Sequence, residues 1–141
     1  MTELPRVLAP GTAVGELLVL DEPLSLWGGM DPVTGELIDV HHPQAGASLA
    51  GLVVAMPSGR GSSSSSYVLA ETIRAGVAPA AFLLGEPDAI VALGALVAGE
   101  LYGLRVPVVV LDGGTYASLA GAAHVSVRAE AGAALSLTAT A

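Results

Sequence analysis

The sequence predicts an α/β fold for a single domain, residues 1–141, with a small parallel sheet, an antiparallel sheet and helices on one side. The length of 141 residues is that of one ordinary domain, and 52% of the residues are hydrophobic, which is enough for a core. Short β-like runs separated by turn residues fill the first half. From Ser66 onward, helix-like and strand-like segments alternate, which indicates right-handed βαβ units and a parallel sheet.

The first half is predicted to be a β-meander that packs on the second face of the parallel sheet. Its turns are rich in glycine, proline and aspartate, and Gly28–Pro32 is the densest of them. The β-like runs are Thr12–Leu20, Leu24–Trp27, Glu36–Val40 and Gly51–Met56.

Two helices are predicted in the second half. Ser66–Ala75 carries apolar residues at helical spacing and ends at Gly76, a natural left-handed cap. The second helix begins with Pro87 as its first residue and ends at Gly103. Its apolar stripe is predicted to consist of Ile90, Leu93, Val97 and Leu101.

The remaining elements of the second half are mostly strands. Pro79–Leu84 and Val106–Leu111 are compact apolar runs, as strands covered on both faces should be. A short helical piece is predicted at Tyr116–Ala120, and two last β-like runs at His124–Arg128 and Ala134–Thr138.

The amino-acid composition argues against several classes of function and indicates where the protein is located. Five arginines, no lysine and thirteen acidic residues give a net charge of −8, and aromatic residues make up only 4%, so nucleic-acid binding is not expected. The chain has no cysteine and therefore no disulfide or thiolate metal site of its own. Without a signal-length or membrane-length apolar run, the chain is expected to be cytoplasmic and to have no membrane partner. The high mean hydropathy of +0.69 predicts a protein partner.

The most informative segment is the loop Pro57–Ser66, Pro-Ser-Gly-Arg-Gly followed by five serines. Its composition alone is equally typical of a flexible Gly/Ser linker. Its position between a predicted buried strand and a helix favours a ligand site, because free backbone N–H groups and the helix dipole point there at an anion. Arg60 adds a side chain that can clamp a carboxylate or stabilise an oxyanion, and the phosphate-binding P-loop pattern is absent.

A serine nucleophile of the hydrolase type would need a histidine base. His41, His42 and His124 all lie in other segments, so the sequence does not show whether one of them reaches the loop. The adjacent His41 and His42 are expected to be surface turn residues beside Pro43, and no metal site is predicted in the chain.

A second dense motif surrounds Trp27. It has two interpretations: a tight turn whose tryptophan anchors a small sheet, or a loop at an interface, where tryptophan is a favoured anchor. On the interface interpretation, Trp27, Gly28, Gly29 and Asp31 form an interface or site loop.

Taken together, several motifs resemble the small, swivelling subunit of the aconitase X enzymes, over about Gly11 to Leu111. The motifs are Leu26–Pro32 (LWGGMDP), Ile38-Asp39, His42-Pro43, Pro57–Ser62 (PSGRGS), Gly76–Ala81 (GVAPAA), Ala92–Ala95 (ALGA) and Val106–Val109 (VPVV). The resemblance implies a swivelling β/β/α domain, equivalent to the mobile C-terminal domain of aconitase. It also implies an iron or iron-sulfur centre that lies in a large-subunit partner, with no cofactor in this chain.

The resemblance further implies a hydro-lyase, because known members dehydrate either cis-3-hydroxy-L-proline or mevalonate 5-phosphate. Their proposed proton acceptor is the serine of the Gly-Arg-Gly-Ser loop, which is Ser62 here. Family loops often continue with cysteine, glycine and serine, whereas this chain has only serines at Ser63–Ser66. Elimination of water needs a base for the proton, and Arg60, with Gly59, Gly61 and Ser63, is predicted to bind substrate or hold the serine oxyanion.

The sequence leaves three alternatives to a dehydratase subunit acting on cis-3-hydroxy-L-proline. A small subunit acting on mevalonate 5-phosphate would favour more cationic residues near the loop than Arg60, with Arg74 one helix away, so cis-3-hydroxy-L-proline is preferred. A phosphohistidine swivelling domain would need a histidine where this chain has Leu93. A noncatalytic binding module would keep the fold without the chemistry, which an intact Gly59–Ser62 motif disfavours.

Overall fold

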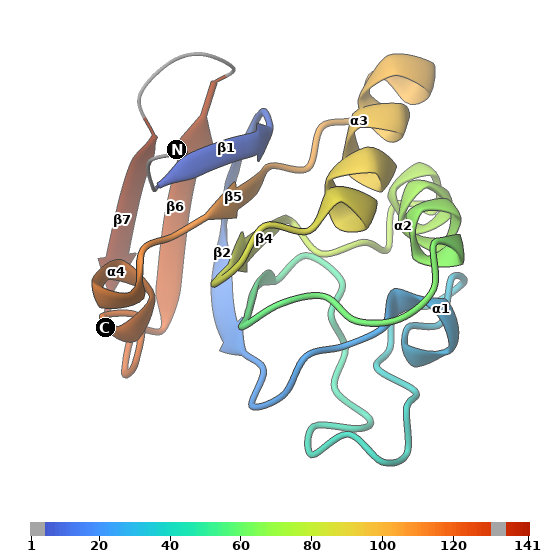
Figure 1. Ribbon diagram of the computed structural model, residues 1–141, viewed down its shortest axis with the longest axis horizontal. Helices are drawn as coiled ribbons and strands as arrows, with labels where there is room; N and C mark the ends of the chain where they lie inside the picture. The colour runs from blue at the N-terminus through green and yellow to red at the C-terminus, as the bar shows by residue number, and fades with distance from the viewer. Residues whose placement is uncertain (1–4, 131–134) are drawn as a thin grey trace.

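The computed structural model describes residues 5–130 and 135–141, and its centre is a curled, mixed sheet of seven strands (Figure 1). The strand order is β1-β5-β4-β3-β2-β6-β7. The strands are β1 (Arg6–Ala9), β2 (Gly11–Val19), β3 (Val53–Met56), β4 (Ala81–Leu84), β5 (Val108–Val110), β6 (His124–Ala129) and β7 (Ser136–Thr140). The helical segments are α1 (Leu26–Gly29), α2 (Ser64–Ala75), α3 (Ala89–Tyr102) and α4 (Gly113–Ala117).

The parallel part of the sheet is built from β2, β3, β4 and β5. Helix α2 connects β3 to β4, and α3 connects β4 to β5, as the alternating pattern of the second half predicts. Every residue of β3, β4 and β5 is buried, which agrees with strands covered on both faces.

Strand β2 joins the parallel part to an antiparallel part. Its last residues, from Leu17 to Val19, pair in parallel with β3, whereas Gly11 to Glu16 pair antiparallel with β6. Strand β7 then pairs antiparallel with β6. Because the sheet curls, β6 and β7 lie on the face of the parallel strands opposite to α2 and α3 (Figure 1).

The two faces of the parallel strands bury separate cores. Towards α2 and α3 the strands present Val54, Met56, Phe82, Leu84, Val108 and Val110. Towards β6 they present Val53, Ala55, Ala81, Leu83 and Val109. The layers are therefore β, β and α, and the predicted fold class is confirmed.

The predicted β-meander of the first half is wrong. Of its β-like runs, only Thr12–Leu20 and Gly51–Met56 contain strands, and β2 and β3 pair in parallel. Between them the chain forms the short segment α1, in which Trp27 and Gly28 have non-helical backbone angles, and isolated bridges such as Glu36 with Ser48. Some apolar residues of this segment are exposed, such as Val33 and Val40, and five others are buried in the core on the helix side: Leu24, Leu26, Met30, Leu37 and Leu49. The antiparallel sheet comes instead from β2, β6 and β7.

The predicted apolar stripe of α3 lies on the wrong face. Leu93 and Leu101 are exposed and Ile90 and Val97 only partly buried. The buried residues are small or short: Val91, Ala92, Gly94, Ala95, Ala98 and Gly99. They allow α3 to pack closely on α2, since a Cβ at Gly94 would lie 2.8 Å from the backbone oxygen of Ser66.

Element ends agree with the sequence where a glycine or a cap decides them. Helices α2 and α3 end at Gly76 and Gly103, both with left-handed backbone angles. Helix α3, however, starts at Ala89 with Asp88 as its N-cap, so Pro87 precedes the helix and is not its first residue. The last predicted strand is observed as β7, shifted towards the C-terminus, and its predicted start at Ala134 lies outside the described residues.

Candidate functional site

A pocket of about 180 Å³ lies at the carboxyl ends of β3 and β4. Two loops form it: residues 57–63 lead from β3 into α2, and residues 85–88 lead from β4 into α3. Its lining residues are Leu24, Leu26, Gly59, Arg60, Gly61, Ser62, Ser65, Asp88, Ile90 and Val91. Two helix N-termini therefore meet at the edge of a parallel sheet where α/β proteins bind ligands, which is where the sequence predicts the serine loop to lie.

Both glycines of the serine loop are required by its geometry. Gly59 runs so close to Asp88 that a Cβ there would overlap the carboxylate oxygen Oδ2. Gly61 has a φ of +95°, which side-chain-bearing residues rarely adopt, and a Cβ there would also lie 2.5 Å from the hydroxyl of Ser25. These two contacts hold the loop between α1 and the start of α3.

Ser62 lies on the rim of the pocket with its side chain exposed. Its Oγ accepts a hydrogen bond from the backbone N–H of Ser64 at 3.1 Å, in the first turn of α2. Ser63 is the N-cap by position, but its hydroxyl makes no capping hydrogen bond. The Ser62 oxygen thus sits at the positive end of the α2 dipole and already faces one N–H donor.

Ser65, a residue to which the sequence pattern assigns no role, holds the neighbouring Trp27 loop in place. The side chain is only 3% exposed, and its Oγ accepts a hydrogen bond from the backbone N–H of Trp27 at 3.0 Å. Ser25 in turn donates from its hydroxyl to the backbone oxygen of Trp27 at 3.0 Å. The serines at positions 62–66 therefore both begin α2 and bind α1 through the hydrogen bond between Ser65 and Trp27.

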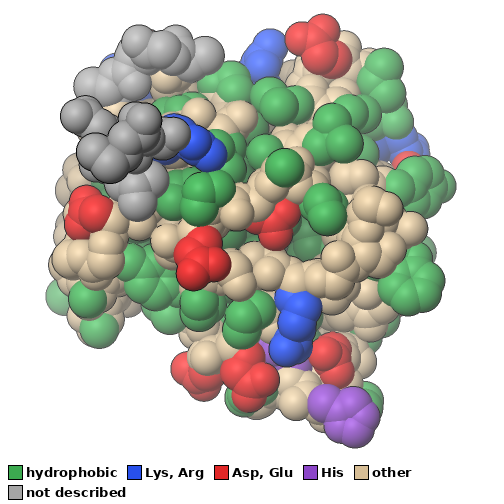
Figure 2. Space-filling view, viewed as in Figure 1, with side chains coloured by type: hydrophobic (Ala, Val, Ile, Leu, Met, Phe, Trp, Pro, Cys, Tyr) green, Lys and Arg blue, Asp and Glu red, His purple; other side chains and the backbone are tan. Residues whose placement is uncertain are grey.

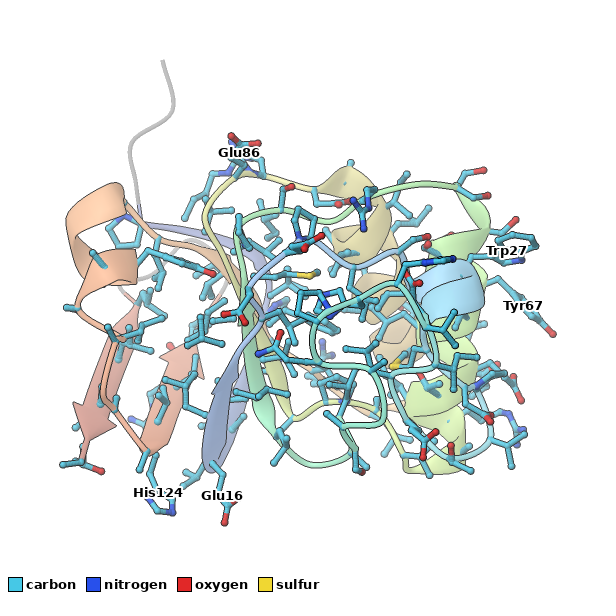
Figure 3. The ribbon with its side chains drawn as sticks, turned by 90° about the horizontal axis from the view of Figure 1, so that it is seen from below. Glu16, Trp27, Tyr67, Glu86 and His124 are labelled. Atoms are coloured by element: carbon cyan, nitrogen blue, oxygen red, sulfur yellow. The ribbon has the colours of Figure 1, made fainter. Side chains whose placement is uncertain are left out.

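Of the two interpretations of the Trp27 motif, the tight turn is observed, although Trp27 itself is exposed and anchors no sheet, and the interface interpretation stays a prediction. Asp31 holds the turn, because its Oδ1 accepts a hydrogen bond from the backbone N–H of Val33 at 2.8 Å. Gly28 has a φ of +81°, and Gly29 is buried with Leu24 2.8 Å from its would-be Cβ. The Trp27 side chain is 57% exposed and projects outward at the end of the molecule where Tyr67 also projects (Figure 3).

Arg60 is the cationic residue of the pocket. Its side chain is exposed, and within residues 5–130 and 135–141 it takes part in no ion pair. Arg74, further along α2, is paired with Glu71, and their hydrogen bond lowers the pKa of Glu71 and raises the pKa of Arg74. Arg74 also does not line the pocket, so Arg60 carries the positive side-chain charge there.

Asp88 is a pocket residue that the sequence analysis missed. Its Oδ1 accepts hydrogen bonds from the backbone N–H groups of Ile90 at 2.9 Å and Val91 at 3.0 Å, which caps α3. Its Oδ2 is the oxygen that lies against Gly59. An aspartate between a predicted strand and a predicted helix is an N-cap signal, and that signal was available in the sequence beside Pro87.

The histidines lie away from the pocket, so the described structure offers no histidine base to Ser62. His42 is only 4% exposed, which corrects the expectation of a surface residue. Its ring bridges two backbone groups: Nε2 donates to the carbonyl of Glu22 at 3.0 Å, and Nδ1 accepts from the N–H of Gln44 at 3.1 Å. His41 is exposed, and His124 starts β6 beside Glu16, far from Trp27 (Figure 3).

Residues 5–130 and 135–141 contain no group of three or more His, Asp or Glu side chains placed to hold a metal ion. Over the same ranges, no helix combines the length and the apolar character that crossing a bilayer requires.

Comparison with known proteins agrees with this geometry. Residues 4–136 match the family described as the aconitase X swivel domain. The chain belongs to this family. The resemblance inferred from the sequence motifs is thereby confirmed.

Two of the relatives are named as a dehydratase and as the small subunit of a dehydratase. Over 108 residues the chain is 54% identical to the cis-3-hydroxy-L-proline dehydratase of Pseudomonas aeruginosa, a match that covers 77% of this chain. The chain spans about a fifth of that protein's length, since the match covers 19% of it. It is 41% identical to the phosphomevalonate dehydratase small subunit of Thermococcus onnurineus, covering 90% of this chain and 92% of that one.

The solved structure of Thermococcus kodakaraensis aconitase X in its holo-form has the same fold. The two superpose with a TM-score of 0.78 at 31% sequence identity, covering 97% of this chain and 96% of the other. The swivel-domain architecture therefore extends over nearly the whole chain.

Proposed function

We propose that this chain is the small subunit of a heteromeric hydro-lyase that dehydrates a small hydroxy acid, cis-3-hydroxy-L-proline, at a site shared with a large subunit. The observation that carries the proposal is the pocket itself: the Ser62 hydroxyl on its rim, at a helix N-terminus, with Arg60 in the same lining. This is the arrangement that proton removal next to a carboxylate needs. The identity to a cis-3-hydroxy-L-proline dehydratase supports the choice of substrate.

In this reaction Ser62 is the proton acceptor. Dehydration removes a proton from the carbon that bears the carboxylate and a hydroxide from the next carbon, which leaves a carbon–carbon double bond and one water. A serine oxygen is a weak base unless donors stabilise its anionic form. The N–H of Ser64, the α2 dipole and the Arg60 guanidinium are the local groups that do so.

Arg60 has a second role available, which is to hold the substrate carboxylate. A guanidinium binds a carboxylate through two parallel hydrogen bonds, and this pairing would orient the adjacent carbon towards Ser62. Delocalisation of charge into a carboxylate held in this way also stabilises the carbanion that proton removal creates. Gly59 and Gly61 shape the loop around these two side chains, whereas Ser63 is the N-cap position of α2 and does not line the pocket.

An iron or iron-sulfur centre does not fit this chain. The sequence has no cysteine, and the described residues contain no cluster of metal-ligating side chains. We therefore assign the centre implied by the family to the large subunit, and with it the part of the site that handles the leaving hydroxyl.

The surface proposed to bind the large subunit lies beside the pocket, around Trp27 and Tyr67. Trp27 is 57% exposed and Tyr67 is 72% exposed, and both project at one end of the molecule (Figure 3). Figure 2 shows further hydrophobic side chains over the layer of α2 and α3. Aromatic residues of this kind are common anchors of protein interfaces, and a large subunit seated there would close the open side of the pocket.

One observation favours a second candidate, the small subunit of a phosphomevalonate dehydratase. The match to the Thermococcus onnurineus small subunit covers 92% of that chain, whereas the match to the Pseudomonas aeruginosa dehydratase covers 19% of that protein. Against it, a phosphate group calls for several cations, and Arg60 is the basic side chain that lines the pocket.

Reconstitution distinguishes these candidates. The chain would be co-expressed with a large subunit of the aconitase X type, and the purified complex would be assayed with each substrate. Dehydration of cis-3-hydroxy-L-proline supports the proposal, and turnover of mevalonate 5-phosphate alone supports the second candidate. A complex that turns over neither substrate would favour a noncatalytic swivel or binding module.

A further inference from the structure

Asp88 places an anionic oxygen in the same pocket as Ser62 and Arg60. We propose that this oxygen, Oδ2 of Asp88, binds the ammonium group of an amino-acid substrate and so selects amino acids over phosphorylated hydroxy acids. The inference rests on the proposed function and adds to it a specificity-determining residue in this chain. Asp88 belongs to the loop after β4, outside the serine loop.

The two oxygens of the Asp88 carboxylate have different contacts. Oδ1 accepts the hydrogen bonds of Ile90 and Val91 and is committed to capping α3. Oδ2 makes no hydrogen bond within the described residues and lies against Gly59. Because the cap fixes the carboxylate, Oδ2 is held in one orientation at the pocket and has capacity for a cationic donor.

The charges of the pocket match a zwitterion. Arg60 and Asp88 both line it, and they form no ion pair with each other, so each remains available to a ligand. A cyclic amino acid presents a carboxylate and a secondary ammonium on one carbon. The carboxylate is complementary to Arg60, and the ammonium is complementary to Asp88.

The chemistry of the reaction brings the ammonium close to Ser62. In cis-3-hydroxy-L-proline, the carbon that loses its proton is the same carbon that carries the nitrogen. Asp88 lines the same pocket as the base, so its carboxylate and this nitrogen would face one cavity. In mevalonate 5-phosphate the corresponding carbon carries a second hydrogen in place of nitrogen, and the substrate brings two more negative charges that Asp88 repels. The two substrates thus differ in charge next to the reacting carbon.

The competing interpretation is that Asp88 only caps α3. Asparagine is as good an N-cap as aspartate, so Asp88→Asn keeps the cap and the size of the side chain while it removes the charge. Asp88→Ser is the second variant, because serine also caps a helix and lacks the second oxygen. A matched control is Asp112→Asn, which removes the same charge at the N-cap of α4, outside the pocket lining.

The test measures inhibition constants of two competing ligands on the reconstituted complex, with cis-3-hydroxy-L-proline as substrate. L-Proline carries the ammonium, whereas cyclopentanecarboxylate has the same ring shape and carboxylate without nitrogen. Wild-type and Asp112→Asn complexes are expected to prefer L-proline. In Asp88→Asn and Asp88→Ser this preference should fall by roughly 10- to 100-fold, as expected for loss of a hydrogen bond to a charged group.

The outcomes separate the two proposals. If the wild-type complex dehydrates cis-3-hydroxy-L-proline and the preference for L-proline is unchanged in both Asp88 variants, Asp88 is a cap only and this inference is wrong. If both ligands lose affinity equally, the loop has shifted, and the inference is again wrong. If the wild-type complex does not act on cis-3-hydroxy-L-proline, the proposed function fails and the inference fails with it.

Discussion

Replacement of Ser62 by alanine tests the centre of the proposed mechanism. The variant removes the oxygen that would accept the substrate proton and leaves the backbone of the serine loop in place. Loss of a general base lowers kcat by roughly 10²- to 10⁴-fold. Substrate affinity should change little, because Arg60 and the rest of the pocket lining remain.

Ser62→Ala should lower the free energy of unfolding only slightly, because the side chain makes a single hydrogen bond. The Ser62 Oγ accepts one hydrogen bond, from the N–H of Ser64, and both residues are exposed, so water can replace the lost acceptor. A side-chain acceptor for a backbone N–H at a helix start is worth about 1 kcal/mol. For a domain of this size, that corresponds to a fall in Tm of about 2–4 °C. The matched control is Ser64→Ala, which removes a neighbouring hydroxyl and keeps the backbone N–H.

The assay is turnover by complexes reconstituted with the large subunit, with Tm and subunit affinity measured in parallel. Ser62→Ala should assemble normally and turn over slowly, and Ser64→Ala should resemble the wild type. Near-normal turnover by Ser62→Ala would refute the assignment. The base would then lie in the large subunit, and this chain would act as a lid over the site.

Three further expectations concern Gly59 in the serine loop, Trp27 at the proposed interface and Asp112 at the N-cap of α4. Gly59→Ala should lower stability by about 1–3 kcal/mol in thermal unfolding, because its Cβ would overlap Asp88; an unchanged Tm would contradict this packing. Trp27→Ala should weaken binding to the large subunit by at least about 2 kcal/mol, roughly 30-fold in Kd by calorimetry, with little change in Tm since the ring is 57% exposed. Hydrogen bonds from Thr115 lower the pKa of Asp112, so its contribution to stability is present above its ordinary pKa of 3.8 and is lost as the pH falls through the lowered value. Unfolding of Asp112→Asn followed between pH 2 and 6 should therefore lack this acid-dependent component, and identical profiles for variant and wild type would disprove it.

Local features of the chain were predictable from its sequence because short-range sterics decide them. Gly76 and Gly103 end their helices in the left-handed conformation, which depends on the absence of a Cβ and on little else. The alternation of strands and helices after Ser66 predicts the parallel sheet through the handedness of crossovers. The serine loop follows from the same alternation, since it joins a buried strand to a helix start.

Tertiary structure decided the features that depend on residues far apart in the chain. Helix α3 is apolar nearly all round, so its sequence could not show that the small face with Gly94 packs on α2 while Leu93 and Leu101 face outward. The run Glu36–Val40 has a β-like composition but pairs only through two isolated bridges, Leu37 with Met30 and Glu36 with Ser48.

The same distinction applies to the site. By itself the sequence determined which loop carries the serine and the arginine, because the motif is contiguous. Only the fold brought Asp88 against Gly59 and buried Ser65 beneath the backbone of Trp27, contacts that span 29 and 38 positions of sequence. It also turned His42 inward, where two backbone groups satisfy its ring. Each of these contacts needs two separate segments to meet, and their meeting is set by the packing of the sheet and its helices, which no local pattern encodes.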